Sequence, residues 1–317
     1  MGPDMVVETL NLVTHCDSNY LSRAYVLRES IMIKSSDCQL YIVCYDKETF
    51  ENALKLDIPK NSLILLENFY RHFPELMQIK NARSHSEFMF CLTPYILIYM
   101  TEILALSKVL YIDADQYITG NPKSLFELDL DPIVAISSHN FLPELTHLNK
   151  YGKYNVGVLL IKRTPESLAL MKWWARKCRE STSVDEKNPE VFGDQKYLDS
   201  FSLIFPDTYV YKNLGINCAP WNCEKIEINA EGAFTMNDTL QMETFHFSGL
   251  KYNKFFFMAG FSRYRKKLPK NVKKLLYDIY VPKLIRADKV LQKEMKIKLT
   301  VRQIIYGVRF QDIGKIR

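Results

Sequence analysis

The chain lacks the glycine-rich loops that many nucleotide-binding folds place after their first strand. Its 317 residues include only 11 glycines and contain neither a G-x-G-x-x-G nor a G-x-x-x-x-G-K-[ST] pattern. These loops depend on glycine because the backbone must approach the phosphates closely. A dinucleotide-dependent enzyme and a P-loop NTPase are therefore not expected.

The chain also lacks paired cysteines and any long uninterrupted hydrophobic run. Its seven cysteines include no C-x-x-C pair, and no second pair joins Cys218 and Cys223 at the spacing of a zinc site. Free thiols are typical of a reducing compartment. The most apolar segment, residues 92–106, is interrupted by Thr101 and Glu102 and is too short to span a bilayer. Because no secretion signal opens the chain either, we expect a cytoplasmic protein.

Charge is distributed unevenly along the chain. Residues 251–317 contain 19 Lys and Arg against 4 Asp and Glu, whereas residues 1–250 contain 23 basic and 32 acidic residues. No repeat or low-complexity linker divides the first part. We therefore expect one catalytic domain in residues 1–250 and a basic, helical C-terminal extension in residues 251–317. Such an extension favours an anionic partner, either lipid or nucleic acid.

Apolar runs alternate with segments of helical spacing over most of the first 250 residues. The pattern predicts strands at residues 6–14, 40–45, 62–66, 109–112, 133–137, 154–161 and 244–247, and helices at residues 20–34, 47–56, 84–106 and 165–179. Strands separated by helices are typical of an α/β protein with right-handed crossovers. We expect a mixed, mostly parallel sheet flanked by helices.

Two aspartates follow the predicted strand at residues 109–112. Asp113 and Asp115 are two residues apart, so they point the same way if the extended geometry continues. Ligands of open α/β sheets bind outside the carboxyl ends of the strands. Carboxylate oxygens there suit Mg²⁺ or Mn²⁺, completed by phosphate oxygens. The alternative is that both aspartates only cap the turn before Asn121 and Pro122.

Three further groups of polar residues carry chemistry that fits such a site. His246 could complete a metal site with two carboxylates, and Lys251 could neutralise diphosphate oxygens. Asp194 and Gln195 suit sugar hydroxyls, and Arg83 precedes the long predicted helix near the same end of the sheet. Each also has a structural interpretation: a buried histidine that serves packing, a helix N-cap at Asp194 and a solvated helix start at Arg83.

In this order and spacing, the motifs resemble the nucleotide-diphospho-sugar transferases of the GT-A fold. They are most similar to family 8, which includes glycogenin and lipooligosaccharide galactosyltransferases, and within it to a bacterial branch. The resemblance covers residues 6–251. One departure is Cys91, which stands where family members usually carry an arginine; Arg83 lies one or two turns earlier. The blocks that carry the resemblance are D-A-D at 113–115, R-S-x-x-E at 83–87, Y-N-V-G at 154–157, F-G-D-Q-K-Y-L-D at 192–199, A-P-W-N at 219–222 and H-x-x-G-x-K at 246–251.

The resemblance implies roles for individual residues. Asp113, Asp115 and His246 would hold Mn²⁺ or Mg²⁺ at the donor diphosphate, with Lys251 as a second positive charge. The remaining implied positions are Asn155, Asp194 and Gln195 in the donor-sugar pocket, Thr14, Asp17 and Asn19 near the base and ribose, and Arg83 and Gly249 among the nucleotide contacts. It also implies transfer with retention of anomeric configuration. Asp194 is a candidate nucleophile.

The function that follows is transfer of a sugar from a nucleotide-diphosphate donor to a glycan or lipid-linked acceptor. One alternative is a nucleotidyltransferase that makes sugar nucleotides, although residues 14–19 contain no glycine for the expected loop. Another is a basic nucleic-acid-binding protein with an inactive transferase body. The intact D-x-D, histidine and lysine argue against that alternative, and we expect no nucleic acid as a partner.

The basic extension contains a possible membrane-binding helix. Leu284, Ala287, Leu291 and Met295 form an apolar stripe in residues 281–300, surrounded by Lys283, Arg286, Lys289, Lys293 and Lys296. A basic amphipathic helix can lie in the interface of an anionic membrane. We therefore expect a peripheral position on the inner face of the cytoplasmic membrane. The alternative is that the stripe packs on the catalytic domain while the lysines remain solvated.

Overall fold

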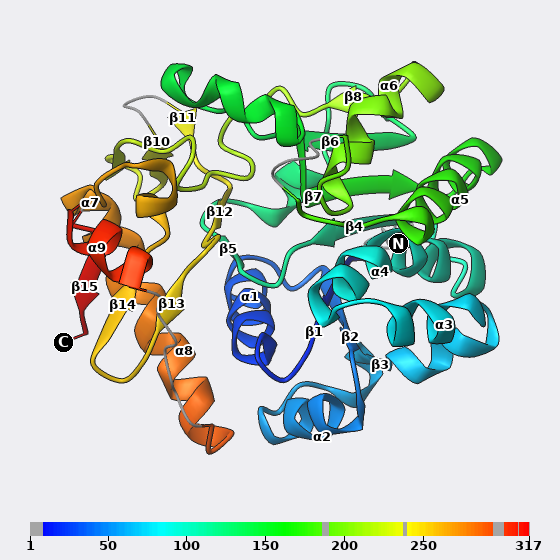
Figure 1. Cartoon of the computed structure of the whole chain (residues 1–317), viewed down its shortest axis with the longest axis horizontal. Helices are drawn as coiled ribbons and strands as arrows, with labels where there is room; N and C mark the ends of the chain where they lie inside the picture. The colour runs from blue at the N-terminus through cyan, green and yellow to red at the C-terminus, as the bar shows by residue number, and fades with distance from the viewer. Residues whose placement is uncertain (1–8, 186–189, 237–239, 294–300, 310, 317) are drawn as a thin grey trace, which may run out of the picture.

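The computed structural model describes residues 9–185, 190–236, 240–293, 301–309 and 311–316 (Figure 1). Its centre is a seven-stranded sheet with the order β3-β2-β1-β4-β7-β6-β8. The first four strands are parallel, β7 runs antiparallel to β4 and β6, and β8 is parallel to β6. The strands are β1 Leu10–Cys16, β2 Cys38–Cys44, β3 Leu63–Leu65, β4 Lys108–Ile112, β6 Val134–Ser138, β7 Tyr154–Lys162 and β8 Tyr209–Val210.

Successive side chains of the central strands enter two different hydrophobic layers, as the two-residue period of a strand requires. On β1, Val13 joins the layer beneath α3, α4 and α5, whereas Leu12 joins the layer beneath α1 and α2. Both faces of the sheet are therefore covered, which explains why β4 and β7 are apolar along nearly their whole length. The helices are α1 Leu21–Lys34, α2 Lys47–Lys55, α3 Glu75–Ala82, α4 His85–Ile98 and α5 Pro165–Glu180.

Side-chain caps define where the helices begin. Ser84 and Glu87 form a capping box at the start of α4, and Thr164 caps α5 just before Pro165. The predicted helix at residues 84–106 is correct in position, but α4 ends at Ile98 and continues as a π-helical turn, Tyr99–Ile103. The predicted mixed, mostly parallel sheet flanked by helices is confirmed.

A third hydrophobic cluster lies beside the sheet and joins residues from both sides of position 250. It includes Val26 of α1, Phe245 of β12 and Leu284 of α8. The predicted boundary between residues 250 and 251 stays a prediction, but residues after it share this core. The remaining elements are β5 Gln116–Ile118, α6 Phe201–Ile204, β9 Ile226–Ile228, β10 Phe234–Met236, β11 Leu240–Gln241, β12 Thr244–His246, β13 Lys251–Tyr252, β14 Phe256–Met258, α7 Lys270–Val272, α8 Asp278–Val290, α9 Val301–Arg309 and β15 Ile313–Lys315.

The predicted membrane-binding stripe is used for packing instead. Helix α8 lies beside α1 (Figure 1), with Leu284 and Ala287 buried. Asp288, also buried, accepts hydrogen bonds from Ser22 of α1 and from Tyr252, the latter at 2.7 Å. The apolar face is thus occupied by the protein itself, which corrects its expected contact with lipid; Met295 and Lys296 lie outside the described residues. In the part of the chain that the structure describes, no helix has the length and apolar character needed to cross a membrane.

Candidate functional site

Asp113 and Asp115 lie at the carboxyl end of β4, in the middle of the sheet. The strand β4 ends at Ile112, where its antiparallel neighbour β7 begins, and the Asp113 amide donates to the Gly157 carbonyl at 3.1 Å. The chain then turns and enters β5, which pairs with β12 so that Gln116 faces His246. This pairing brings His246 to the two aspartates from 131 residues further along the chain.

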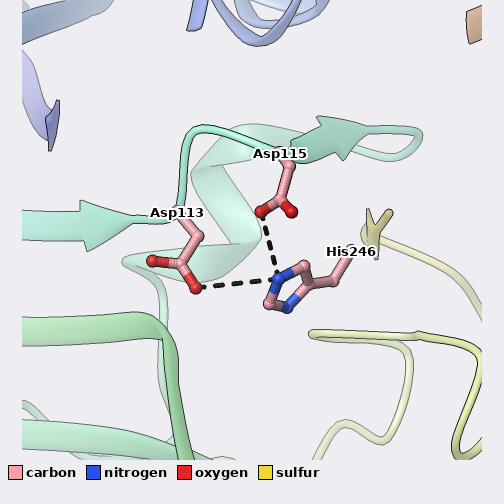
Figure 2. Close-up of side chains that lie close together, drawn as sticks. All are labelled: Asp113, Asp115 and His246. Atoms are coloured by element: carbon pink, nitrogen blue, oxygen red, sulfur yellow. Dashed lines mark ion pairs between the residues drawn. The ribbon is translucent and has the colours of Figure 1, made fainter. Parts of the chain in front are cut away.

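The side chains of Asp113, Asp115 and His246, here called the metal triad, converge on one point (Figure 2). The His246 Nε2 atom lies 3.1 Å from Asp115 Oδ1 and 3.7 Å from Asp113 Oδ2. One ligand atom from each residue lies within 4.8 Å of the other two. Two oxygens and one imidazole nitrogen are a suitable ligand set for Mn²⁺ or Mg²⁺.

The spacing of these atoms fits an ion between them. Adjacent ligands of an octahedral ion, each about 2.1 Å from the metal, lie about 3 Å apart. The Asp115–His246 separation already has this value, whereas the Asp113–His246 separation is longer, 3.7 Å. Tyr111 donates a hydrogen bond of 3.0 Å to the other oxygen of Asp113 and so orients that carboxylate.

Electrostatics within the metal triad favour a bound cation. Burial and the neighbouring Asp115 charge raise the pKa of Asp113, although His246 opposes them. Burial also acts to raise the pKa of Asp115, but His246 and Arg23 outweigh it and the pKa falls below its usual range. Burial acts to lower the pKa of His246, yet the two carboxylates more than compensate and raise it. The carboxylates therefore hold positive charge at this point, and a metal ion would displace the imidazole proton.

Asn217 orients the imidazole from behind. Its Oδ1 lies 3.2 Å from His246 Nδ1 and accepts from Gln116 at 2.6 Å, so Nδ1 is the donor and Nε2 faces the carboxylates. Its side-chain nitrogen, Nδ2, donates to the side-chain oxygen Oδ1 of Asn155 at 2.9 Å. Partners of this kind fix the orientation of a metal-binding histidine.

Gly157 is required by the same network. A Cβ atom at this position would lie 2.6 Å from Asn155 Oδ1 and 2.9 Å from both Asn217 Oδ1 and Gln116 Nε2. Polar side chains behind the metal triad therefore approach the backbone closely at this glycine. Any side chain at residue 157 would displace groups that orient His246.

The metal triad opens into a cavity of about 350 Å³, here called the first cavity. Asp194 and Gln195 lie in its wall, and so does Asn155, whose amide is 3.4 Å from Gln195 Oε1. Asp194 is buried and accepts a hydrogen bond of 2.8 Å from Thr93 of α4. Burial raises the pKa of Asp194 to about 7. A carboxyl of this pKa can exist in either protonation state near neutral pH.

The turn after β1 contributes one of its three predicted residues to the first cavity. Asp17 lines the cavity, accepts from the amides of Asn19 and Tyr20, and contacts His85 Nε2 at 2.9 Å. Thr14 is buried and does not line the first cavity, and Asn19 bonds to Asp17 outside it. Among described residues, His15, Cys16 and Tyr20 complete this side of the wall.

Arg83 does not line the first cavity, contrary to the expectation of a nucleotide contact. Its guanidinium donates to the carbonyls of Cys178, at 2.6 Å, and Arg179, and to the Thr182 hydroxyl at 2.9 Å. These carbonyls end α5 and have no partner within that helix. The guanidinium is thus used to cap α5.

Gly249 lines neither the first cavity nor the second cavity that adjoins it, whereas Lys251 lines the second alone. Gly249 has a φ of 76°, which favours glycine, and a Cβ atom there would lie 2.9 Å from the Arg263 guanidinium carbon. Lys251 donates to Gln303 at 3.2 Å and lines the second cavity, which has a volume of about 720 Å³.

Several residues of the site escaped the sequence analysis. Asn217, Thr93, Tyr111 and His85 act through contacts with predicted residues. Asn217 lies just before the A-P-W-N block, which was the one local signal. His85 lies inside the R-S-x-x-E block but at one of its variable positions, and Thr93 and Tyr111 lie within regular segments whose apolar pattern gives no reason to single them out.

Comparison with known proteins finds a family model that matches part of the chain. Residues 11–167 match the model of glycosyl transferase family 8. This segment runs from β1 to the start of α5 and includes Asp113, Asp115 and Asn155. His246 lies beyond the matched segment, and so do most of the residues that line the second cavity.

Two bacterial proteins and one solved structure extend the similarity. YfnD of Bacillus subtilis (strain 168) is 24% identical over 73% of this chain and 76% of its own length. YfnF of the same organism is 26% identical over 73% of this chain and 78% of its own length. The structure of the bifunctional glycosyltransferase WbbM has a TM-score of 0.52 at 11% identity and covers 93% of this chain and 53% of its own. At this identity the likeness concerns the fold, and it agrees with the predicted GT-A type.

Proposed function

We propose that this chain transfers a sugar from a nucleotide-diphosphate donor to a glycan or lipid-linked acceptor. The chain is a glycosyltransferase of the GT-A fold and is similar to family 8. The observation that carries the proposal is the metal triad, placed at the carboxyl end of β4 and opening into the first cavity. Carboxylates and an imidazole aimed at one point suit a divalent ion shared with diphosphate oxygens.

The residues of the metal triad would hold Mn²⁺ or Mg²⁺ against the diphosphate. When bound, the ion neutralises the negative charge that builds on the departing nucleotide diphosphate. Asp113 is oriented by Tyr111, and His246 by Asn217, so the ligands are held before the donor arrives. Asp17 lies in the same wall and is positioned to accept from the ribose or base.

Asn155, Asp194 and Gln195 form the wall that would hold the donor sugar. The bond from its anomeric carbon to the diphosphate breaks, a bond to the acceptor oxygen forms, and the acceptor hydroxyl loses its proton. We propose retention of configuration, in keeping with the family. Among the described residues, the first cavity is lined by the two carboxylates of the metal triad, by Asp17 and by Asp194. Of these, Asp194 lies beside Asn155 and Gln195, which supports it as a nucleophile or as a group that stabilises positive charge on the sugar.

Lys251 is proposed to add positive charge near the diphosphate from the wall of the second cavity. Gly249, two residues earlier, lines neither cavity, and its lack of a side chain leaves room for the Arg263 guanidinium. The roles of Thr14, Asn19 and Arg83 in nucleotide binding receive no support from their positions.

A panel of nucleotide sugars tests the proposed reaction. The full chain is incubated with each donor and Mn²⁺, and slow release of free nucleotide diphosphate is measured. One or more donors should be hydrolysed, and Asp194→Asn should reduce hydrolysis while nucleotide affinity stays nearly unchanged. Formation of sugar nucleotides from sugar phosphates would instead indicate the nucleotidyltransferase. Absence of hydrolysis and of metal-dependent nucleotide binding would refute the proposal.

Peripheral membrane association is proposed on charge alone. The exposed Lys274, Arg286 and Lys289 surround a helix whose apolar face is covered by α1. Removal of residues 262–317 would expose the third hydrophobic cluster, so a truncated chain is a poor test. A better variant is the full chain with three charge reversals, Lys274→Glu, Arg286→Glu and Lys289→Glu. The unaltered chain should pellet with anionic liposomes at low salt and the variant should not; equal pelleting of both would exclude the idea.

A further inference from the structure

The second cavity adjoins the first and has about twice its volume. Four residues line both cavities: Phe90, Asn155, Gln195 and Ser248. Volumes of about 350 and 720 Å³ both fall in the range of small-ligand sites, about 300–1,000 Å³. A transfer reaction needs its second substrate within bonding distance of the first. The second cavity is therefore where the acceptor of the proposed reaction would bind.

The charge of the second cavity is positive. Lys251, Arg263 and Arg265 line it, and none of its described lining residues is an aspartate or glutamate. Neither arginine forms an ion pair or a side-chain hydrogen bond with another described residue, and both are exposed to solvent. Their guanidinium donors are thus available to a ligand that enters the cavity.

The two arginines are held in place by their backbone. Residues 260–265, here called the arginine loop, are anchored by the buried carboxylate of Asp312. Asp312 accepts from the Gly260 and Phe261 amides at 3.1 and 3.0 Å and from the Ser262 hydroxyl at 2.7 Å. The Arg263 guanidinium also lies directly over Gly249. Because the loop backbone is anchored, both arginines start from fixed positions at the same cavity. Such a preorganised pair loses less conformational freedom when it binds an anion.

Aromatic rings form the rest of the wall. Tyr151 and Phe192 lie with ring centroids 4.7 Å apart, and Trp221 and Tyr264 with centroids 6.0 Å apart. Trp221 is 2% exposed and donates its indole hydrogen to the His139 carbonyl at 2.8 Å, which fixes the ring. The C–H faces of pyranose rings are apolar and pack on such surfaces, while their hydroxyls remain free for polar groups.

We propose that the second cavity binds an acceptor glycan that carries an anionic group, a phosphate or a carboxylate, held by Arg263 and Arg265. The inference rests on the proposed function and adds the chemical class of the acceptor. Guanidinium groups bind both anions through paired hydrogen bonds, so the chemistry is shared by phosphorylated glycans and glycans with acidic sugars. The aromatic rings bind the sugar rings, and the arginines select for charge.

An array of neutral, uronic-acid-bearing and phosphate-bearing oligosaccharides tests the inference with the full-length protein. We compare the unaltered chain with Arg263→Gln/Arg265→Gln, with the charge-retaining Arg263→Lys/Arg265→Lys, and with Lys267→Gln, an exposed cation of the same segment outside both cavities. Acidic glycans should be retained over neutral ones, and the glutamine variant should lose roughly tenfold or more in affinity. The lysine variant should be intermediate, and Lys267→Gln should behave like the unaltered chain. Comparison of the uronic-acid-bearing with the phosphate-bearing oligosaccharides shows which anion the cavity prefers.

Nucleotide diphosphate and Mn²⁺ binding, measured on the same variants, separates this inference from the proposed reaction. Unchanged nucleotide affinity in Arg263→Gln/Arg265→Gln would support an acceptor role. Nucleotide affinity that falls as far as glycan affinity would assign the arginines to the donor and overturn the inference, while the proposed reaction would stand. Equal retention of neutral and acidic glycans, or no retention of either, would also overturn it. Failure of the proposed reaction would appear separately, as lack of metal-dependent nucleotide binding.

Discussion

The two adjoining cavities share part of their wall but carry charges of opposite sign. The first is lined by four carboxylates, Asp17, Asp113, Asp115 and Asp194, and by no lysine or arginine among its described residues. The second is lined by Lys251, Arg263 and Arg265 and by no carboxylate among its described residues. Both are proposed to receive negatively charged ligands, so they must neutralise charge by different means.

The difference indicates how each cavity handles an anion. A carboxylate-lined cavity repels a diphosphate unless a divalent ion is present, which makes donor binding depend on metal. A cavity lined by arginines binds an anion directly, with an affinity that falls as salt screens the charges. Metal removal should therefore affect the first cavity and salt the second, and the following experiments test that separation.

Loss of the metal triad should have the largest effect. Asp115→Ala removes a ligand whose oxygen lies 3.1 Å from His246 Nε2, and the transfer rate should fall a hundredfold or more. EDTA should have the same effect on the unaltered chain. Asp207→Ala, which removes an exposed carboxylate outside both cavities, is the matched control. Full activity of Asp115→Ala or full activity in EDTA would contradict the metal assignment.

The buried carboxyl of Asp194 should make the free energy of unfolding depend on pH. A free aspartate has a pKa of about 4, whereas burial raises that of Asp194 to about 7. Between these values the native state binds more protons than the unfolded state, so this group lowers stability as pH rises. Asp194→Asn should therefore be more stable than the unaltered chain at pH 8, on the order of 2–4 kcal/mol, and nearly equal at pH 4. Urea unfolding at both pH values without metal measures this, and equal stability at pH 8 would exclude it.

Asn217 should affect metal affinity without contacting the metal. Asn217→Ala removes the acceptor 3.2 Å from His246 Nδ1, so the imidazole loses its fixed tautomer and orientation. Mn²⁺ affinity, measured by calorimetry, should fall about tenfold. Acidic-glycan binding in the second cavity should stay the same in this variant. An unchanged Mn²⁺ affinity would show that His246 is not positioned by Asn217 or is not a ligand.

Replacement of Lys251 should have the smallest effect on activity. The experiment also distinguishes whether Lys251 interacts with the donor or with the acceptor. It lines the second cavity but is proposed to act at the diphosphate. Lys251→Ala should lower turnover severalfold while nucleotide affinity changes little, because its charge matters most as the diphosphate leaves. Loss of acidic-glycan affinity with unchanged turnover would move Lys251 to the acceptor side. The Lys267→Gln variant again controls for a change in net charge.

Much of the protein followed from the sequence because the signals were local. Buried strands are continuous apolar runs, and Pro165 and Ser84 mark helix starts wherever they fold. The D-x-D pattern predicted a metal site because two carboxylates close together after a strand can share one cation. The chain turns between Asp113 and Gln116 instead of staying extended, yet both carboxylates still face His246. The family 8 similarity rested on ordered short blocks, and the match over residues 11–167 agrees with it.

Only the tertiary structure decided which polar residues work together. Arg83 and Asp194 looked similar in sequence as polar residues beside helices, yet one caps α5 and the other lies buried in the first cavity. The apolar stripe of α8 has the pattern of a membrane helix, but that pattern states only that a face is buried, not against what. Its partner is α1, whose sequence lies more than 240 residues earlier.

The sequence by itself determined the layered α/β architecture, Asp113 and Asp115 as a local pair of candidate metal ligands, and the basic character of residues 251–317. It offered His246 only as a possible third ligand. Those properties depend on periodicity and composition, which act over a few neighbouring residues. The tertiary structure decided that His246 meets that pair, that Asn217 orients it and that the basic segment lines a second cavity through Arg263 and Arg265. Each of these contacts joins distant parts of the chain, because strand pairing and core packing, rather than local preference, bring them together.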